Sequence, residues 1–177
     1  MNRDELSQAI RQAAYLEGDF VLRSGKRSRY YLDKYRFETV PAILREVGRL
    51  LAERATGATT RIAGAELGGV ALAAAASMAG GLPFVIIRNQ KKDYGTSKLF
   101  EGVIDKGDVV LLVEDIATTG GQVLEAAKVI ADQGASVEKI VAVIDRQEGA
   151  RENIEKAGYR FESLFTSADL GIGVPKG

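Results

Sequence analysis

Short runs of apolar residues alternate along this chain with segments in which apolar residues recur every three or four positions. The short runs are typical of strands buried on both faces, and the wider spacing is typical of helices with one buried face. The predicted strands cover residues 61–64, 83–87, 109–113, 139–144 and 159–165. The predicted helices cover residues 4–17, 39–55, 122–134 and 150–158, with an alanine-rich helix between the glycine-rich turn 66–69 and Gly80. This alternation predicts an α/β fold with a mainly parallel central sheet flanked by helices.

The first 37 residues differ in pattern and are expected to form a small N-terminal cap. After the first helix, two short apolar segments, 20–22 and 30–32, flank Ser24 and Gly25, which predicts two strands joined by a turn. A solvated hairpin and an anion-facing subdomain both fit this segment. Its cations are Arg23, Lys26, Arg27, Arg29 and Lys34. Residues 38–177 are expected to form the core of the same single domain.

The clearest chemical pattern lies between Val109 and Gln122. Five apolar residues precede Glu114 and Asp115, and the small polar turn 118–121 follows. Ligands of open parallel sheets bind beyond the carboxyl ends of the strands. Glycines there let backbone N–H groups approach an anion, and the next helix directs its positive end to the same point. We predict a phosphate cradle, with the carboxylates serving hydroxyl groups or a divalent metal; an ordinary strand–turn–helix crossover is the alternative.

Two other segments place charged residues after predicted strands. Residues 88–102 are basic and lack apolar periodicity, and loops of this length in compact domains are commonly functional lids. Asp145 and Arg146 follow the strand 139–144, and an arginine offers a planar fork to a carboxylate. A solvated charged loop and a helix-capping ion pair are the respective alternatives.

The composition of the chain limits the reaction mechanisms and the partners that it can have. The chain has 177 residues with 24 acidic and 24 basic side chains, and this balance argues against nucleic-acid binding by bulk electrostatics. It has no cysteine and no histidine, which excludes thiolate nucleophiles and Ser–His or Cys–His mechanisms. No apolar run approaches the length of a membrane span, and no secretion signal is apparent. We therefore expect a cytoplasmic protein without a nucleic-acid or membrane partner.

The stretch of strand, two acids and Thr-Thr-Gly-Gly resembles the phosphoribosyl-pyrophosphate (PRPP) signature of type I phosphoribosyltransferases. The segment 24–33, the loop 88–102 and the Asp-Arg-Gln-Glu segment 145–148 are similar to those of orotate phosphoribosyltransferases, in the same order. The resemblance implies a PRPP site in which the acids hold the ribose hydroxyls and the Thr/Gly turn holds the 5′-phosphate. Its predicted residues are Arg88, Asn89, Lys92, Tyr94, Glu114, Asp115, Ile116, Ala117, Thr118, Thr119, Gly120, Gly121 and Gln122.

The same resemblance implies which residues contact the base and which act on the leaving group. Catalytic roles fall to Arg88, Lys92 and Asp115. Orotate-binding roles fall to Arg23, Tyr31, Leu32, Thr118 and Arg146.

The basic loop departs from the family pattern at three positions. Asn89 stands where the family has a pyrophosphate-binding lysine, Tyr94 where it has a histidine, and Ser97 where it has a glycine. Arg88, Lys92 and the other motif positions stay in register, so the loop is still expected to close over the pyrophosphate.

The resemblance implies transfer of ribose 5-phosphate from PRPP to orotate, giving orotidine 5′-monophosphate and pyrophosphate in the synthesis of UMP. Mg²⁺ is the implied cofactor, held mainly by PRPP with no direct protein ligand expected. A homodimer is implied, with loop 88–102 shared across its interface, and the alanine-rich helix would allow close subunit contact. A phosphoribosyltransferase for another base and a non-enzymatic PRPP-sensing regulator on the same fold remain the alternatives.

Overall fold

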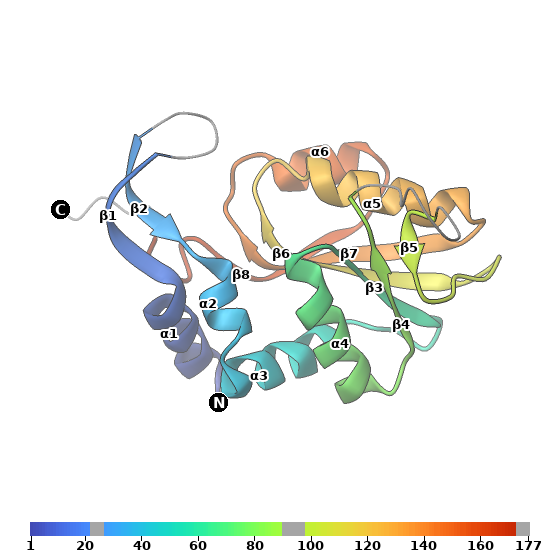
Figure 1. Ribbon diagram of the computed structural model, residues 1–177, viewed down its shortest axis with the longest axis horizontal. Coiled ribbons are helices and arrows are strands. Elements are labelled where there is room, and N and C mark those ends of the chain that lie inside the picture. The colour runs from blue at the N-terminus through green and yellow to red at the C-terminus, as the bar shows by residue number, and fades with distance from the viewer. Residues whose placement is uncertain (22–26, 90–97, 173–177) are drawn as a thin grey trace.

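The computed structural model describes residues 1–21, 27–89 and 98–172, and its centre is a six-stranded sheet (Figure 1). The strand order is β5-β4-β3-β6-β7-β8, in which only the pairing of β5 with β4 is antiparallel. The strands are β3 (Arg61–Ala65), β4 (Phe84–Ile87), β5 (Phe100–Glu101), β6 (Val109–Ala117), β7 (Ser136–Asp145) and β8 (Phe161–Thr166). The predicted α/β fold with a mainly parallel sheet is confirmed.

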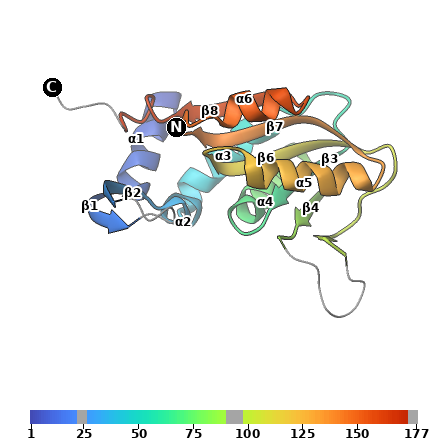
Figure 2. The same cartoon turned by 90° about the horizontal axis from the view of Figure 1, so that it is seen from above.

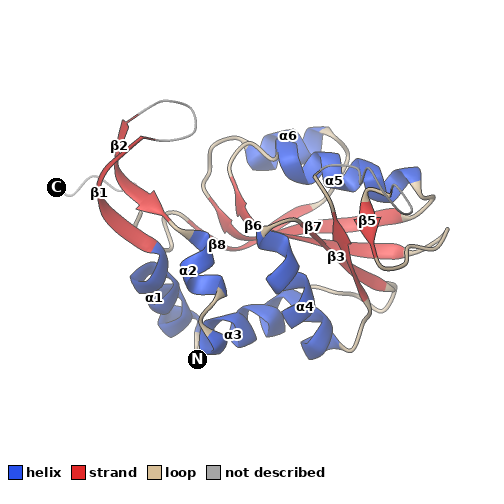
Figure 3. Cartoon of the chain, viewed as in Figure 1, coloured by secondary structure: helices blue, strands red, loops and turns tan. Residues whose placement is uncertain are grey.

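Helices cover both faces of this sheet (Figure 3). On one face lie α3 (Pro41–Ala52) and α4 (Gly68–Gly80), and on the other lie α5 (Gly121–Asp132) and α6 (Ala150–Lys156). Successive residues of β6 face opposite layers: Leu111 and Val113 belong to the core under α3 and α4, whereas Val110 and Leu112 belong to the core under α5 and α6. Burial on both faces explains why the first five residues of this strand, 109–113, are all apolar.

The N-terminal cap consists of α1 (Arg3–Ala14), β1 (Tyr15–Val21), β2 (Arg27–Leu32) and α2 (Lys34–Glu38). Figure 2 shows it at one end of the molecule, with β1 and β2 forming a sheet of their own. The predicted helix 4–17 ends too late, because Tyr15 and Leu16 pair with Leu32 and Tyr31 across the hairpin. The predicted turn at Ser24 and Gly25 lies outside the described residues.

The predicted helix 39–55 corresponds to α3 (Pro41–Ala52), and a separate short helix, α2, precedes it. The Thr39 hydroxyl donates to the carbonyl of Tyr35, so this side chain closes α2 instead of capping α3. Pro41 begins α3, and proline disfavours a helical conformation in the residue before it. The helical conformation is therefore interrupted just before Pro41. The preceding helix α2 is an element that the sequence pattern does not predict.

Strand β6 extends beyond its predicted end, and β5 lies in a segment for which no strand is predicted. β6 continues to Ala117, so Glu114 and Asp115 lie within the strand instead of after it, because Glu114 and Ile116 pair with Ala142 and Ile144 of β7. The two residues of β5 also pair with β4 inside the segment predicted as a loop. Within the described ranges, no helix has the length and apolar composition needed to cross a membrane.

Candidate active site

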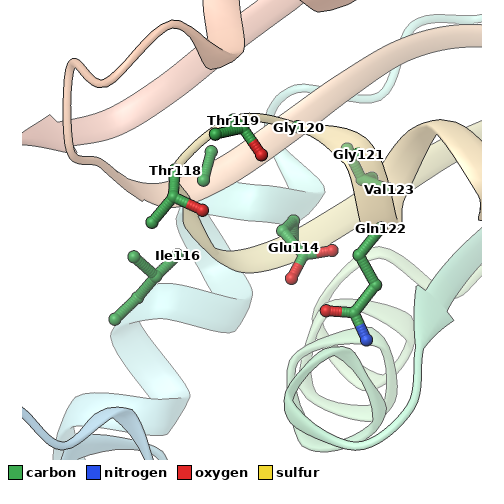
Figure 4. A pocket seen from close by; sticks show the side chains of 9 residues that line it. Glu114, Ile116, Thr118, Thr119, Gly120, Gly121, Gln122 and Val123 are labelled. Atoms are coloured by element: carbon green, nitrogen blue, oxygen red, sulfur yellow. The ribbon is translucent and has the colours of Figure 1, made fainter. Parts of the chain in front are cut away.

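A cavity of about 230 Å³ lies where β6 passes into α5 (Figure 4). The Glu114 carboxylate enters it from the strand, and the hydroxyls of Thr118 and Thr119 enter it from the turn. Its lining is a nearly continuous stretch of chain: Glu114, Ile116, Ala117, Thr118, Thr119, Gly120, Gly121, Gln122 and Val123. The structure thus brings most of the predicted PRPP residues around one hollow, and Asp115 is not among the lining residues.

The turn over this cavity is held from both sides. Gly120 has φ 79° and ψ 0°, a left-handed conformation that suits glycine, and its carbonyl accepts the first helical hydrogen bond, from the N–H of Leu124. From α6, the amide of Asn153 donates to the carbonyl of Thr119 at 2.9 Å. The N-terminus of α5 therefore faces the cavity in a fixed position, where its backbone N–H groups and dipole favour an anion.

The two adjacent acids have different surroundings. Glu114 is 8% exposed and faces the cavity, and its Oε2 atom makes no hydrogen bond within the described part of the chain. Asp115 is 1% exposed; its Oδ2 lies 2.6 Å from Nζ of Lys34, and its Oδ1 accepts from the N–H of Ile116. Gly68, at the start of α4, makes room for it, since a Cβ there would lie 1.5 Å from Oδ2.

Burial sets the protonation of this group of side chains. Burial, and then the charge of Asp115, raises the pKa of Glu114 well above its usual range. The same two causes raise the pKa of Glu38 to about 8. Burial alone would lower the pKa of Lys34, but its contact with Asp115 raises it. Lys34 stays charged beside Asp115, while Glu38 and Glu114 resist ionisation.

On the other side of the carboxyl edge, Arg146 follows β7 and reaches the cap. Its backbone N–H donates to the carbonyl of Ala117, and its Nη2 lies 3.4 Å from the hydroxyl of Tyr30 and 2.9 Å from Oε1 of Glu148. Tyr30 in turn stacks on Tyr15, with ring centroids 5.7 Å apart. The structure therefore joins Arg146 to the hairpin.

The predicted base-contacting residues of the hairpin are distributed differently. Leu32 is buried in the core, and Tyr31 is exposed with its ring against Phe20. Tyr30, which the sequence does not predict to serve the base, is the hairpin residue that contacts Arg146. Arg23 lies outside the described residues.

At the start of the basic segment, Arg88 and Asn89 lie beside the cavity's helix. Nη1 of Arg88 is 3.5 Å from Oε1 of Glu101 on β5. The Asn89 backbone N–H donates to Oε1 of Glu66, its side-chain amide donates to the Glu66 carbonyl, and its Oδ1 accepts from Gln122. Asn89 thus links the turn after β3 to the first turn of α5. Lys92 and Tyr94 fall outside the described residues.

Sequence reasoning missed Lys34, Glu38 and Tyr30 as neighbours of the site. Each belongs to a segment far along the chain from its partner, and the sequence does not predict the helix that carries Lys34 and Glu38. The one available signal was the charge of Lys34, which counts among the cations of the hairpin segment. In the described ranges, no three His, Cys, Asp or Glu side chains are grouped to hold a metal ion.

Comparisons with known proteins agree on one family. Residues 35–164 match the model of the phosphoribosyl transferase domain. The chain is 44% identical over 167 residues to the orotate phosphoribosyltransferase of Methanocella arvoryzae, covering 94% of this chain and 95% of that one. It is 45% identical over 172 residues to that of Pyrococcus horikoshii, covering 95% and 92% of the two chains.

Solved structures are similar over the whole chain. The orotate phosphoribosyltransferase of Mycobacterium tuberculosis, in complex with Fe(III) dicitrate, superposes with a TM-score of 0.88 at 34% identity, covering 97% of this chain and 100% of that one. The same enzyme in complex with PRPP has a TM-score of 0.83 at 33% identity, with the same coverage. An adenine phosphoribosyltransferase from Leishmania donovani, at 20% identity, TM-score 0.71 and coverage of 97% and 85%, shares the fold alone.

Proposed function

This chain belongs to the phosphoribosyl transferase domain family, and we propose that it is an orotate phosphoribosyltransferase that uses PRPP to make orotidine 5′-monophosphate and pyrophosphate. The observation that carries the proposal is the cavity at the end of β6, where a carboxylate, two threonine hydroxyls and a helix N-terminus converge. Relatives named orotate phosphoribosyltransferase match nearly the full length of the chain. The product would serve the synthesis of UMP.

PRPP is proposed to bind along the lining of this cavity. The 5′-phosphate would accept hydrogen bonds from the hydroxyls of Thr118 and Thr119 and from backbone N–H groups around Gly120 and Gly121. The ribose hydroxyls would donate to Glu114, whose Oε2 lacks a partner in the described residues. Asp115 lies directly behind, and its negative charge would favour the cationic character that the ribose acquires as pyrophosphate departs.

Arg146 is proposed to orient orotate. Its polar contacts with Tyr30 and Glu148 both use Nη2, its guanidinium carbon lies 6.0 Å from the centroid of the Tyr30 ring, and among the described residues no hydrogen bond is made by its Nη1 or Nε. These atoms would meet the orotate carboxylate, with Thr118 on the cavity side and the hairpin on the other. Selection of an anionic base would follow from this charge. Arg23, Tyr31 and Leu32 remain predictions for the hairpin's part in base binding.

Arg88, together with Lys92, is proposed to neutralise the leaving pyrophosphate. Arg88 follows β4 at the same edge of the sheet as the cavity, and Asn89 beside it is bonded to Glu66 and Gln122. Closure of residues 88–102 over the site would exclude water, which would otherwise hydrolyse the reactive sugar. Tyr94 remains a predicted PRPP contact in this segment.

Mg²⁺ is the proposed cofactor and would be held mainly by oxygens of PRPP. The cavity suits such a complex, because Oε2 of Glu114, which has no hydrogen-bond partner in the described residues, faces it and would meet the ribose of the PRPP that holds the ion. When bound, the ion would supply positive charge to the pyrophosphate oxygens. Every other step rests on the side chains and backbone groups named above.

An ultraviolet assay of orotate consumption with PRPP and Mg²⁺ tests the function directly. We expect orotate to be consumed only when PRPP is present, with stoichiometric release of pyrophosphate. Uracil and adenine, offered at the same concentration, should react at least about a hundredfold more slowly, because neither presents a carboxylate to Arg146. Faster use of either base, or PRPP binding without any transfer, would support one of the alternatives and overturn the proposal.

We further propose a homodimer in the cytoplasm that closes its loops across the interface. The exposed face of α3 and α4 carries an apolar hollow of about 410 Å³, and Met78 at its rim is 81% exposed. Small alanines on α4 would let a second copy approach closely. The residues that line this hollow are Pro41, Leu44, Arg45, Ala75, Met78 and Ala79.

Sedimentation tests the dimer, and mixing two inactive variants tests the shared loop. The inactive variants Lys92→Ala and Arg146→Ala are refolded together in equal amounts. If each loop serves the other subunit, every mixed dimer contains one site with both substitutions and one site with neither. About a quarter of wild-type activity should then return under random reassortment. Mixed dimers that are confirmed by differential tags but inactive would exclude the shared loop, and a monomer in sedimentation would exclude the dimer.

A further inference from the structure

An ion pair joins the N-terminal cap to the central strand directly behind the cavity. Lys34 is the first residue of α2, and its Nζ lies 2.6 Å from Oδ2 of Asp115 on β6. In Figure 1, α2 lies beside the labelled end of β6. The cap carries no other ion pair to the acids of β6 among the described residues, so this contact ties the two parts of the molecule at the site.

Asp115 is enclosed on its other sides as well. Its Oδ1 accepts from the N–H of Ile116, and Gly68 leaves only the space of a hydrogen atom where a side chain would begin. The carboxylate is almost fully buried, so water cannot substitute for a lost partner. Removing the ammonium of Lys34 would therefore leave a buried negative charge that must rotate, acquire a proton or draw in another group.

The charges around Lys34 show why one ammonium matters here. Asp115 and Glu114 approach from β6, and Glu38 lies one helical turn beyond Lys34 on α2, 3% exposed and with its Oε1 unpartnered in the described residues. Asp33 and Tyr35 flank Lys34 in the sequence, and the Tyr35 ring lies under its ammonium at 5.4 Å. The ammonium is thus placed among several carboxyl groups, but its close ion pair is made with one of them.

Asp115 is also connected to the cavity through a hydrogen bond to the backbone that follows it. The hydrogen bond from the Ile116 N–H to Oδ1 couples the carboxylate's orientation to the peptide that leads into the lining residues Ile116 and Ala117. Glu114, on the opposite side of the same strand, projects into the cavity. A rotated Asp115 would move this peptide and bring its charge closer to Glu114.

We propose that Lys34 is a positioning residue for PRPP. It holds the Asp115 carboxylate in one orientation and thereby keeps the end of β6 and Glu114 in the position that binds the ribose. This inference rests on the proposed function. It assigns a role in the PRPP site to the cap, which the resemblance linked only to the base. Lys34 acts through Asp115 and does not line the cavity itself.

A double-mutant cycle separates this role from direct contact with the substrate. Lys34→Met should raise the KM for PRPP about tenfold or more, as expected for a lost charge-assisted contact, with the KM for orotate within about twofold of wild type. Lys34→Arg should restore most of the loss. In an Asp115→Asn background, Lys34→Met should add little, because the group it positions has already lost its charge. PRPP binding measured by calorimetry should follow the same order.

The matched control is Lys139→Met, which breaks another partly buried ion pair, Lys139 to Glu162 at 2.7 Å between β7 and β8. It should lower the melting temperature without a selective effect on the KM for PRPP.

If Lys34→Met does not fold, Asp115→Asn is compared with the double variant, which removes both charges, and equal KM values for PRPP are expected. An unchanged KM in Lys34→Met, or a full loss added to Asp115→Asn, would overturn the proposal. An inactive wild type would instead refute the proposed function, while calorimetry with PRPP still tests Lys34.

Discussion

The proposed phosphate side and the proposed base side of the candidate site are built in different ways. The phosphate side is formed by the stretch from Glu114 to Val123, and Asn153 anchors its turn from α6. The base side joins Arg146, after β7, to Tyr30 of a hairpin that forms a separate sheet, through a hydrogen bond of 3.4 Å. The first is formed by one stretch of chain, with the ion pair of Lys34 and Asp115 as its link to the cap, and the second depends on how the cap sits on the core. Substitutions should therefore affect the two substrates separately.

The largest effect is expected from Glu114→Gln on the phosphate side. The substitution keeps the shape of the side chain but replaces a carboxyl oxygen proposed to accept from the ribose hydroxyls with an NH2 group that can only donate, and a buried hydrogen-bonding group left without its partner costs about 1–3 kcal/mol. We expect kcat/KM for PRPP to fall up to about a hundredfold in steady-state assays. Glu152→Gln, on the exposed surface of α6, is the control and should behave as wild type. Equal activity of the two variants would remove Glu114 from the site.

Arg146→Ala should break the base side alone. Loss of a charged fork raises the KM for orotate about ten- to a hundredfold, whereas PRPP binding measured by calorimetry should change less than about twofold. Arg151→Ala, which removes an exposed arginine paired with Glu155, is the control. An equal loss of affinity for both substrates would show that the two sides are not independent.

Gly120→Ala should distort the phosphate turn without changing any charge. Its φ of 79° strains an L-residue by about 1–2 kcal/mol, and the new Cβ would lie 3.0 Å from Ile154. We expect about a five- to thirtyfold weaker kcat/KM for PRPP. Gly158→Ala is the control, since its φ of 91° imposes similar strain outside the cavity lining and a Cβ there would meet nothing within 4 Å. If both alanines were tolerated equally, the left-handed turn would not matter for phosphate binding.

Tyr30→Phe should produce a smaller effect, on the base side. It removes the hydroxyl that Arg146 contacts but keeps the ring stacked on Tyr15. A neutral hydrogen bond contributes about 0.5–1.5 kcal/mol, so the KM for orotate should rise about two- to tenfold, near the lower value because the bond is long. Tyr31→Phe is the comparison: it keeps the ring predicted to contact the base, so this KM should rise only if the Tyr31 hydroxyl takes part. A reversed order would mean that Tyr31 serves the base through its hydroxyl.

Glu38→Gln should change activity least of these variants. Its expected effect is on the pH dependence of stability, because Glu38 holds a proton next to the phosphate side. Burial and then the charge of Asp115 raise the pKa of Glu38 to about 8. The folded protein therefore keeps a proton between about pH 4.5 and 8 that the unfolded chain releases, and stability falls as pH rises through this window. The melting temperature of Glu38→Gln should match wild type near pH 5 and exceed it increasingly towards pH 9. A difference that is independent of pH would contradict the raised pKa.

The difference between the phosphate side and the base side also explains which parts of the site could be predicted from the sequence. The phosphate side is contiguous, so strand, acids, turn and helix are all visible as one pattern in the segment 109–122. Lys34 and Asp115, or Tyr30 and Arg146, meet only after the chain folds, and no periodicity links residues so far apart. The predicted strand is also too short, because charged side chains normally end an apolar run, and here pairing with β7 carries β6 past Glu114 and Asp115.

The substitution of asparagine for the family lysine at position 89 is a similar case. From the sequence it signifies only a missing cation. In the structure, Asn89 donates to Glu66 and its Oδ1 accepts from Gln122, and an ammonium, which has no acceptor atom, could not accept that second hydrogen bond.

The separate two-stranded sheet of the cap has a consequence for how such proteins diversify. Because β1 and β2 pair with each other and the six main strands pair among themselves, a change of length or sequence in the hairpin shifts no register in the main sheet. Insertions, deletions and grafts in this module can be inherited without rebuilding the fold. Lineages, and protein engineers, can therefore exchange the hairpin as a unit while the phosphate-binding turn is passed on intact.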